Sequence, residues 1–221
     1  NTPIKADGII AIKIRDDDEL VAVRGASAGD ELIMVSRAGQ AVRFSESEVR
    51  AMGRDTSGVR GMNVSQKGNA VLAMDVADES RELLVVTENG YGKRTPITQY
   101  RETKRGAMGV KTIKLTDARG ALAGALVVRE HEELVFISQN GMVQRTGVNG
   151  ISQQGRSTQG VRVMNVREDD QVSAVALIVE PEGEPGELAA DAGAAPVADA
   201  EAPASGSDAA DVSPNGAADD A

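Results

Sequence analysis

The chain has 221 residues, 41% of them hydrophobic and 26% charged, with a net charge of -10, no Cys and one His. The length suits one large domain or two small ones. The absence of Cys excludes disulfides, thiolate metal sites and Cys nucleophiles, and favours a reducing, cytoplasmic compartment. No stretch is long and apolar enough for a membrane span, and no signal-peptide pattern opens the chain.

The sequence repeats with a period of 51 residues from residue 31 to about residue 180. Gly and Arg recur at fixed places, and a basic residue lies two places after the last glycine. The recurring positions are Gly39, Gly90 and Gly141; Arg43, Arg94 and Arg145; Arg54, Arg105 and Arg156; Gly58, Gly109 and Gly160; and Arg60, Lys111 and Arg162. A period of this size is typical of solenoids, propellers and arrays.

Residues 1–30 match only the second half of this unit. Gly8–Ile12 resembles Gly58–Met62, and Glu19–Val23 resembles the last strand expected in each copy. An array cut within a unit would leave an open sheet edge, which natural proteins normally avoid. Because the chain also begins with Asn rather than Met, we expect a fragment with further units upstream.

Each full copy predicts four short strands. The first is an apolar, β-branched run, followed by a Gly-containing turn of the kind that closes hairpins. The first strands are expected at residues 31–36, 82–87 and 133–138, and a second at residues 40–44 of the first copy. The third are expected at residues 59–64, 110–115 and 161–166, and the fourth at residues 70–76, 121–128 and 172–179.

Four strands in about 51 residues are typical of a propeller blade. We therefore expect an all-β fold of about three and a half blades, with full blades at 31–81, 82–132 and 133–180 and half a blade at 1–30. An ordinary β-sandwich is disfavoured because sandwiches do not repeat so regularly.

A polar, Gly-rich loop separates the second and third strands of each copy, and in the second copy it has adjacent cations. Residues 90–115 contain seven basic residues and one acid, whereas acids gather at residues 16–19, 75–82, 130–133 and 168–170. Since both patterns follow the repeat, we expect a basic rim and a separate acidic rim. A basic track can bind the sugar-phosphate backbone without reading sequence, although alternating charges could also simply solvate strand edges.

The last 41 residues carry the whole charge imbalance. Ten of the 34 acids lie in residues 181–221, which contain no Lys or Arg, no aromatic residue and five of the seven Pro. This composition cannot bury enough apolar area to offset chain entropy, so a disordered acidic tail is expected. The tail could compete with DNA for the basic rim, or it could be a solubilising extension.

The repeat resembles the C-terminal DNA-wrapping domain of bacterial DNA gyrase A. The resemblance rests on the apolar strands, the segment Asn89–Thr95 and the loops that begin at Met52, Thr103 and Gln154. It implies a β-pinwheel whose basic rim wraps duplex DNA, so that the ATP-dependent holoenzyme, a type II DNA topoisomerase, introduces negative supercoils. The family's box, Gln-Arg-Arg-Gly-Gly-Lys-Gly, is degenerate here, and its nearest heptad retains Lys104, Arg105, Gly106 and Gly109.

The resemblance implies non-specific duplex DNA as the ligand, and gyrase B and a second copy of gyrase A as partners through an N-terminal portion. ATP and Mg²⁺ would belong to other parts of that assembly, which would lie in the cytoplasm with the nucleoid. The expected DNA-binding residues are Arg54, Arg60, Lys93, Arg94, Lys104, Arg105, Gly106, Gly109, Lys111, Arg145, Arg156 and Arg162. Of these, Arg94 and Arg145, together with Arg43, could instead be structural and pair with acids of a neighbouring blade.

We expect no catalytic residue and no metal site in this chain. His131 stands among acids and is expected at the surface, and no thiolate or second histidine accompanies it. The only aromatics are Phe44, Phe136, Tyr91 and Tyr100, so base stacking is disfavoured. Two alternatives remain: the C-terminal domain of the corresponding topoisomerase IV protein, and a protein-interaction propeller, which is disfavoured by the lack of Trp and of kelch-type Gly-Gly.

Overall fold

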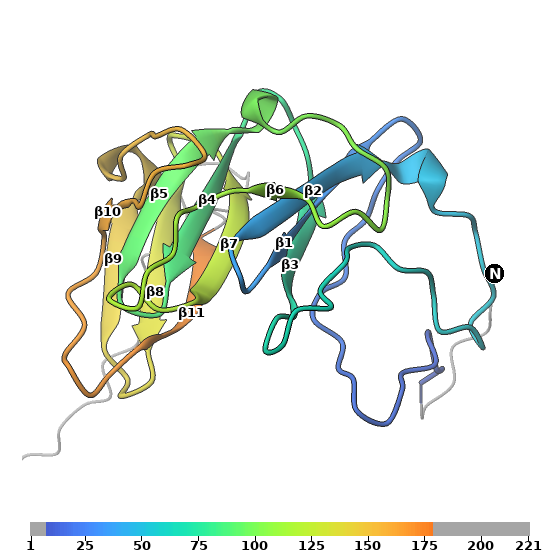
Figure 1. Cartoon of the computed structure of the whole chain (residues 1–221), viewed down its shortest axis with the longest axis horizontal. Helices are drawn as coiled ribbons and strands as arrows, with labels where there is room; N and C mark the ends of the chain where they lie inside the picture. Colours follow the sequence, from blue (N-terminus) through green and yellow to red (C-terminus); the bar gives the residue numbers. More distant parts are fainter. Residues whose placement is uncertain (1–7, 179–221) are drawn as a thin grey trace, which may run out of the picture. The chain divides into compact units, whose positions relative to one another are not determined.

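The computed structural model describes residues 8–178, in which antiparallel sheets are joined by loops and three one-turn 3-10 helices (Figure 1). The predicted all-β class is therefore confirmed. No helix in this described part is long and apolar enough to cross a membrane. The predicted acidic tail lies outside the described residues.

Three sheets follow one another along the chain. The first has the order β3 (Val71–Val76), β1 (Glu31–Ser36), β2 (Gln40–Ser45) and β6 (Val110–Lys111). The second has the order β10 (Val161–Arg162), β5 (Tyr91–Pro96), β4 (Glu82–Thr87) and β7 (Leu122–Val128). The third has the order β11 (Val172–Ile178), β8 (Glu133–Ser138) and β9 (Val143–Gly147). The 3-10 helices η1 (Glu46–Glu48), η2 (Ile97–Gln99) and η3 (Val148–Gly150) each follow a second strand.

The strand predictions are confirmed for the first and fourth strands of each copy and for the second strand of the first copy; β5 and β9 are the equivalent second strands of the other two copies. The first strands begin and end at the expected residues, and a glycine with positive φ closes each hairpin. At Gly90, where φ is +77°, an added Cβ would lie 2.2 Å from the carbonyl oxygen of Met164. This turn therefore requires glycine both for its backbone conformation and for the close approach of the next repeat.

The third strands differ from the expectation, because they are short and pair with the preceding sheet. Lys111 of β6 pairs with Gln40 of β2, and Arg162 of β10 pairs with Tyr91 of β5. The second and third full repeats thus each contribute their third strand to the sheet of the preceding repeat. The segment 59–64, predicted as a third strand, forms none, because no sheet edge among the described residues pairs with it.

Residues 8–30 also form no strand, so the fourth strand expected at 19–23 is a wrong prediction for this structure. Their apolar side chains are exposed, Ile10 by 74% and Val23 by 72%. No sheet among the described residues covers these side chains or supplies ladder hydrogen bonds to this segment.

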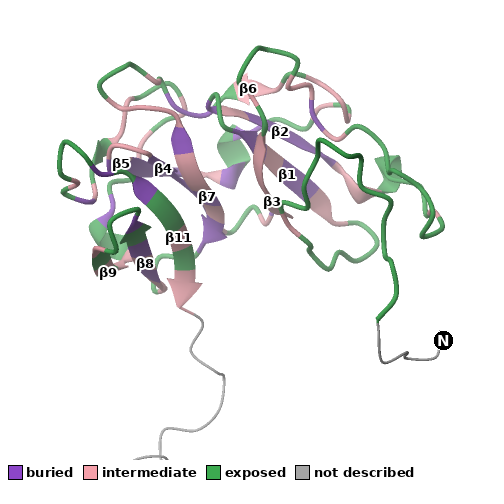
Figure 2. Cartoon of the chain, turned by 90° about the horizontal axis from the view of Figure 1, so that it is seen from below, coloured by how far each residue is buried: buried purple, intermediate pink, exposed green. Residues whose placement is uncertain are grey.

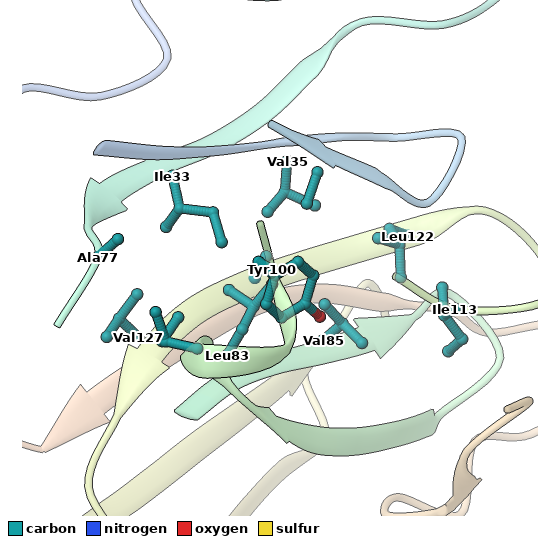
Figure 3. Close-up of a cluster of buried hydrophobic side chains, with 12 residues drawn as sticks. Ile33, Val35, Ala77, Leu83, Val85, Tyr100, Ile113, Leu122 and Val127 are labelled. Carbon is teal, nitrogen blue, oxygen red and sulfur yellow. The ribbon is translucent and has the colours of Figure 1, made fainter. Parts of the chain in front are cut away.

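The core lies between the sheets and explains the apolar runs. On β4, Leu83 and Val85 pack with Ile33 and Val35 of β1, whereas Leu84 and Val86 pack with the third sheet's cluster around Phe136. Figure 3 shows the first of these clusters, with Tyr100 among its side chains. Because β4 is covered on both faces, every residue in it is buried (Figure 2).

Candidate nucleic-acid interface

Two of the period-51 arginines join one repeat to the next. Arg43 pairs with Glu31 on its own sheet and with Glu79, and it donates to the carbonyl of Tyr100 in the next repeat at 3.0 Å. Burial opposes the charged form, but hydrogen bonds from Arg43 to the two carboxylates outweigh it and raise the pKa of the guanidinium. The side chain is only 8% exposed.

Arg94 repeats this arrangement 51 residues later. It pairs with Glu82 at 2.7 Å and Glu130 at 3.2 Å, and donates to the carbonyl of Ile151 at 2.7 Å. Burial again opposes the charge, and the two carboxylates again raise the pKa of the guanidinium. Arg43 and Arg94 are thus held inside the protein, but the acids that they pair with belong to their own repeats and not to a neighbouring blade as predicted. The next repeat supplies only the carbonyls. The guanidinium of Arg94 is buried in this junction, which leaves it no exposed charge for the expected DNA contact.

Arg145, the third arginine of this set, differs from the other two in its exposure. It pairs with Glu133, the equivalent of Glu31 and Glu82, but its side chain is 60% exposed. The position equivalent to Glu79 and Glu130 is occupied by Pro181. Arg145 is therefore accessible in a way that the two junction arginines are not.

The Gly-rich loops at residues 52–58, 103–109 and 154–160 are held in register by one recurring hydrogen bond. Backbone N–H groups of Lys13, Asn63 and Lys114 donate to the carbonyls of Thr56, Ala107 and Thr158, at 3.2, 2.9 and 2.9 Å. Each loop is thus fixed to the preceding repeat at the same place. Consecutive repeats therefore present their loops in series along one side of the sheets.

Glycines of the second loop are required by the fold. Gly109 has a φ of +88°, and an added Cβ would lie 2.4 Å from the carbonyl oxygen of Ala41 on β2. Gly106 has a φ of +80°, and its N–H donates to the carbonyl of Gly61 at 2.7 Å. Both glycines let the loop pack against the preceding repeat, a role that sequence reasoning had assigned to phosphate contact.

Strands β6 and β10, which pair with the sheet of the preceding repeat, each carry one exposed cation. Lys111 lies on β6 and Arg162 on β10, the outermost strands of their sheets, and both side chains are exposed. Arg60, the equivalent residue of the first copy, is exposed as well. These three residues, here called the edge cations, recur once per repeat. Lys111 and Arg162 lie on outermost strands, whereas Arg60 lies in a segment that forms no strand.

The cations of the Gly-rich loops differ in how exposed they are and in how many hydrogen bonds they donate within the protein. Arg54 and Lys104 are exposed at the surface of their loops. Arg105 is half-buried and donates to the carbonyls of Glu48 at 3.3 Å and Arg60 at 2.6 Å. Its backbone N–H also donates to the Glu48 carboxylate at 2.8 Å. Arg105 therefore ties the loop to the first repeat while its charge stays near the surface.

Lys93 is fully buried and lies beneath the third loop. Its Nζ donates to the carbonyl of Gly155, to the carbonyl of Arg156 at 2.8 Å and to Thr158 Oγ1 at 3.0 Å. Burial, together with the nearby charge of Arg156, lowers the pKa of Lys93 to about 8. Sequence reasoning placed Lys93 on DNA, and the structure instead makes it an internal support for the loop that carries Arg156.

Acidic side chains gather at the other end of the strands. A groove of about 540 Å³ is lined there by Glu79, Arg81, Glu130 and His131, among others. His131 is exposed, as predicted, and the described residues contain no group of three His, Cys, Asp or Glu able to hold a metal. The same groove is also lined by Glu82, Arg94 and Arg129, so its three acids are matched by three arginines and the expected acidic rim stays a prediction.

One basic residue of this surface was missed by sequence reasoning. Arg119 lies in the loop between β6 and β7, and its guanidinium carbon stands 4.0 Å from the ring centre of Tyr91. It does not belong to the recurring set, because the equivalent positions are Gly68 and Asp170. Only the tertiary contact with Tyr91 reveals it.

Comparisons with known proteins agree with this architecture. A family model described as "DNA gyrase C-terminal domain, beta-propeller" matches residues 3–26, 30–78, 81–129 and 132–178. The DNA gyrase A protein of Staphylococcus epidermidis is 41% identical over 179 residues, which are 80% of this chain and 20% of that protein. The DNA gyrase A protein of Streptomyces coelicolor is 40% identical over 192 residues, covering 81% of this chain and 22% of that protein.

Solved structures give the same result. A DNA gyrase A C-terminal domain superimposes with a TM-score of 0.72 at 30% identity, over 78% of this chain and 59% of that one. A topoisomerase IV C-terminal domain superimposes with a TM-score of 0.71 at 24% identity, which shows the fold alone; it covers 76% of this chain and 52% of that one. The chain spans about a fifth of the length of the curated relatives it matches. With its pinwheel exchange of strands and its four family-model matches, the chain belongs to the DNA gyrase A C-terminal domain family.

Proposed function

We propose that this chain binds and wraps duplex DNA without reading its sequence. The observation that carries the proposal is the exposure of the edge cations, Arg60, Lys111 and Arg162, at equivalent sequence positions of consecutive repeats, with Lys111 and Arg162 on outermost strands. A series of such cations can follow a phosphate backbone, because phosphate contacts depend on charge and position and carry no base information. The loops between them, fixed in register by their shared hydrogen bond, support the same path.

The proposed contact set follows from exposure. The edge cations, Arg54 and Lys104 present exposed charge, whereas Arg105 and Arg156 contribute charge from half-buried positions. Arg145 is an accessible addition at the third sheet, and Gly106 and Gly109 act by shaping the loop. If the edge cations, Arg54 and Lys104 each neutralise one phosphate, these five contacts alone give a log-log salt slope of about 4.5, since each phosphate contributes about 0.9 on duplex DNA.

The proposed role extends to a larger assembly. Wrapping by this domain would support ATP-dependent negative supercoiling by a holoenzyme. That holoenzyme would also contain gyrase B and a second copy of gyrase A, and it would lie in the cytoplasm with the nucleoid. Identity of 41% to gyrase A proteins favours this role over that of topoisomerase IV, for which the likeness at 24% identity concerns the fold. A protein-interaction propeller remains the competing outcome of the binding test.

We also propose a division of the chain into functional blades. Residues 31–81, 82–132 and 133–180 would each form one blade, residues 1–30 the second half of another, and residues 181–221 an acidic tail. Family-model matches that break near residues 26–30, 78–81 and 129–132 support these boundaries.

The test is a salt series of duplex binding by the full chain, with a duplex of about 150 base pairs. The variant Arg60→Gln/Lys111→Gln/Arg162→Gln should reduce the salt slope by about 3 and weaken binding by at least about tenfold at low salt. The control Arg24→Gln/Arg81→Gln/Arg129→Gln removes the same charge at residues that lie by Asp75 or line the groove with Glu79 and Glu130.

Equal losses in the two triple variants would show that net charge, and not the outer edge, drives binding. No binding by the wild-type chain at low salt, or binding that does not depend on salt, would refute the proposal and favour a protein partner.

A further inference from the structure

A cluster of cations gathers around the only partly exposed aromatic ring of the described residues. The guanidinium carbons of Arg119 and Arg162 lie 4.0 and 5.1 Å from the ring centre of Tyr91, distances at which cation-π attraction operates. Arg162 also donates a hydrogen bond to Tyr91 Oη at 2.7 Å. The three residues come from β5, β10 and the loop before β7, so the fold brings together two positive charges that the chain keeps far apart.

Both guanidiniums retain donors. Arg119 Nε has no hydrogen-bond partner among the described residues but is shielded from solvent, so Arg119 would have to reach an anion through its terminal nitrogens. Arg162 uses one N–H group on Tyr91, and its side chain is exposed. Since a guanidinium carries five N–H donors in a planar fork that fits phosphate oxygens, the pair has unused capacity for an anion.

A pocket of about 210 Å³ adjoins this cluster. Its lining includes Tyr91, Arg162 and Arg167, and two acids, Glu168 and Asp170. The Asp170 carboxylate is committed to the protein: it accepts from the backbone N–H groups of Asn140 at 3.0 Å and Gln171 at 2.8 Å. Glu168 is exposed, so the two acids of the lining balance Arg162 and Arg167. Arg119 does not line the pocket, but it lies against Tyr91 and brings the net positive charge beside it.

The cluster is not a blade-building element, because it occurs in one repeat. The positions equivalent to Tyr91 are Gln40 and Met142, and those equivalent to Arg119 are Gly68 and Asp170. By contrast, Arg162 has basic equivalents in both other copies. In the second sheet, the recurring edge cation Arg162 is therefore joined by a second arginine, Arg119, and by the ring of Tyr91, which orients both.

We propose that Arg119 and Arg162, oriented by Tyr91, form a site for one phosphate group, either a phosphodiester of duplex DNA or a free phosphate ion. The DNA source rests on the proposed function, because Arg162 is one of the edge cations. The hydrogen bond from Arg162 lowers the pKa of the Tyr91 hydroxyl, as expected for a phenol held within a positive field. Tyr91 acts as the positioning residue of the site.

The duplex arm of the test compares Arg119→Gln with Arg129→Gln in the full chain. These arginines lie beyond opposite ends of β7, so the two variants lose the same charge on the same blade. Arg119→Gln should weaken duplex binding about tenfold at low salt and reduce the salt slope by about 1, and Arg129→Gln should change affinity less than about twofold. Tyr91→Phe, which keeps the ring but removes the hydroxyl, should give an intermediate loss.

The phosphate arm uses inorganic phosphate and tyrosine fluorescence. The chain has no Trp and two Tyr, of which Tyr100 is buried, so a signal that disappears in Tyr91→Phe reports on Tyr91. Titration with inorganic phosphate at constant ionic strength should change this signal in the wild type and in Arg129→Gln, but not in Arg119→Gln.

The two arms distinguish DNA from free phosphate as the ligand, and they distinguish failure of the phosphate site from failure of the proposed function. Loss of duplex affinity specific to Arg119→Gln supports the site with DNA as its source, and a phosphate response with unchanged duplex affinity supports it with a free ion. If Arg119→Gln behaves like Arg129→Gln in both arms, the site is refuted. If the wild-type chain does not bind duplex at all, the proposed function fails, while the phosphate arm still decides whether the site exists.

Discussion

Removal of the buried amine of Lys93 should abolish a specific pH dependence of stability. Burial and the charge of Arg156 lower the pKa of Lys93 to about 8 in the folded chain, from an ordinary value of 10.5. Between these two values the unfolded chain binds more protons than the folded chain. The free energy of unfolding should therefore rise with pH across this window, because the folded state no longer has to bury a charge.

The magnitude follows from the two pKa values. One pKa unit corresponds to about 1.4 kcal/mol, so the full difference is about 3 kcal/mol, of which about 2 kcal/mol develops between roughly pH 7 and pH 9.5. A neutral amine still has two N–H donors for the carbonyls of Gly155 and Arg156. Deprotonation therefore removes the cost of the charge and leaves most of the loop's hydrogen bonds in place.

The assay is urea unfolding of the wild type, Lys93→Met and Lys104→Met at both pH values, followed by far-ultraviolet circular dichroism. Relative to Lys93→Met, the wild type should gain about 2 kcal/mol from the lower to the higher pH. Lys104→Met, which removes an exposed lysine, should gain as much as the wild type. Because the comparison is a difference between variants, contributions from the tyrosines cancel. Parallel pH curves for the wild type and Lys93→Met would refute the reasoning.

Three further outcomes are expected. Arg94→Gln should lower the free energy of unfolding by about 3 kcal/mol, because it leaves the buried Glu82 without its cation. Arg145→Gln, at an exposed pair, should lower it by less than about 1 kcal/mol. Equal shifts in denaturant midpoint for the two variants would contradict the junction role of Arg94. Gly109→Ala should cost more than about 1 kcal/mol in thermal unfolding, because φ is +88° and the new Cβ would meet a carbonyl oxygen; a stable variant would show that the loop can shift. Deletion of residues 181–221 should raise duplex affinity at low salt if the acidic tail competes for the rim, and unchanged binding in the same titration would dispose of that idea.

Strand positions were predictable because each first strand is an apolar run closed by a glycine turn. The run Glu82–Thr87 is continuous because β4 is packed on both faces, and that continuity is visible in the sequence. The third strands could not be placed in the same way. A strand of two residues such as β6 carries too little pattern, and its partner β2 lies about 70 residues earlier in the chain.

The adjacent pair Lys93 and Arg94 shows where prediction of the site failed. Both residues were expected to contact DNA, with a structural role as the alternative for Arg94, although alternation along a strand places neighbouring side chains on opposite faces. Both are buried, because β5 carries the arginine junction on one side and the loop of the next repeat, through Gly155 and Thr158, on the other. The period identified these residues as important, but it did not show which contact each one makes.

The sequence by itself determined the repeat, the strand order within a copy and the family, because these depend on residue type and spacing along the chain. The tertiary structure alone decided which cations are exposed, that Gly109 serves packing, and that Arg119 meets Tyr91. The physical reason is that burial and ion pairing depend on what the neighbouring repeat brings against a side chain. Equivalent residues such as Arg94 and Arg145 therefore share a position in the period and differ in their surroundings.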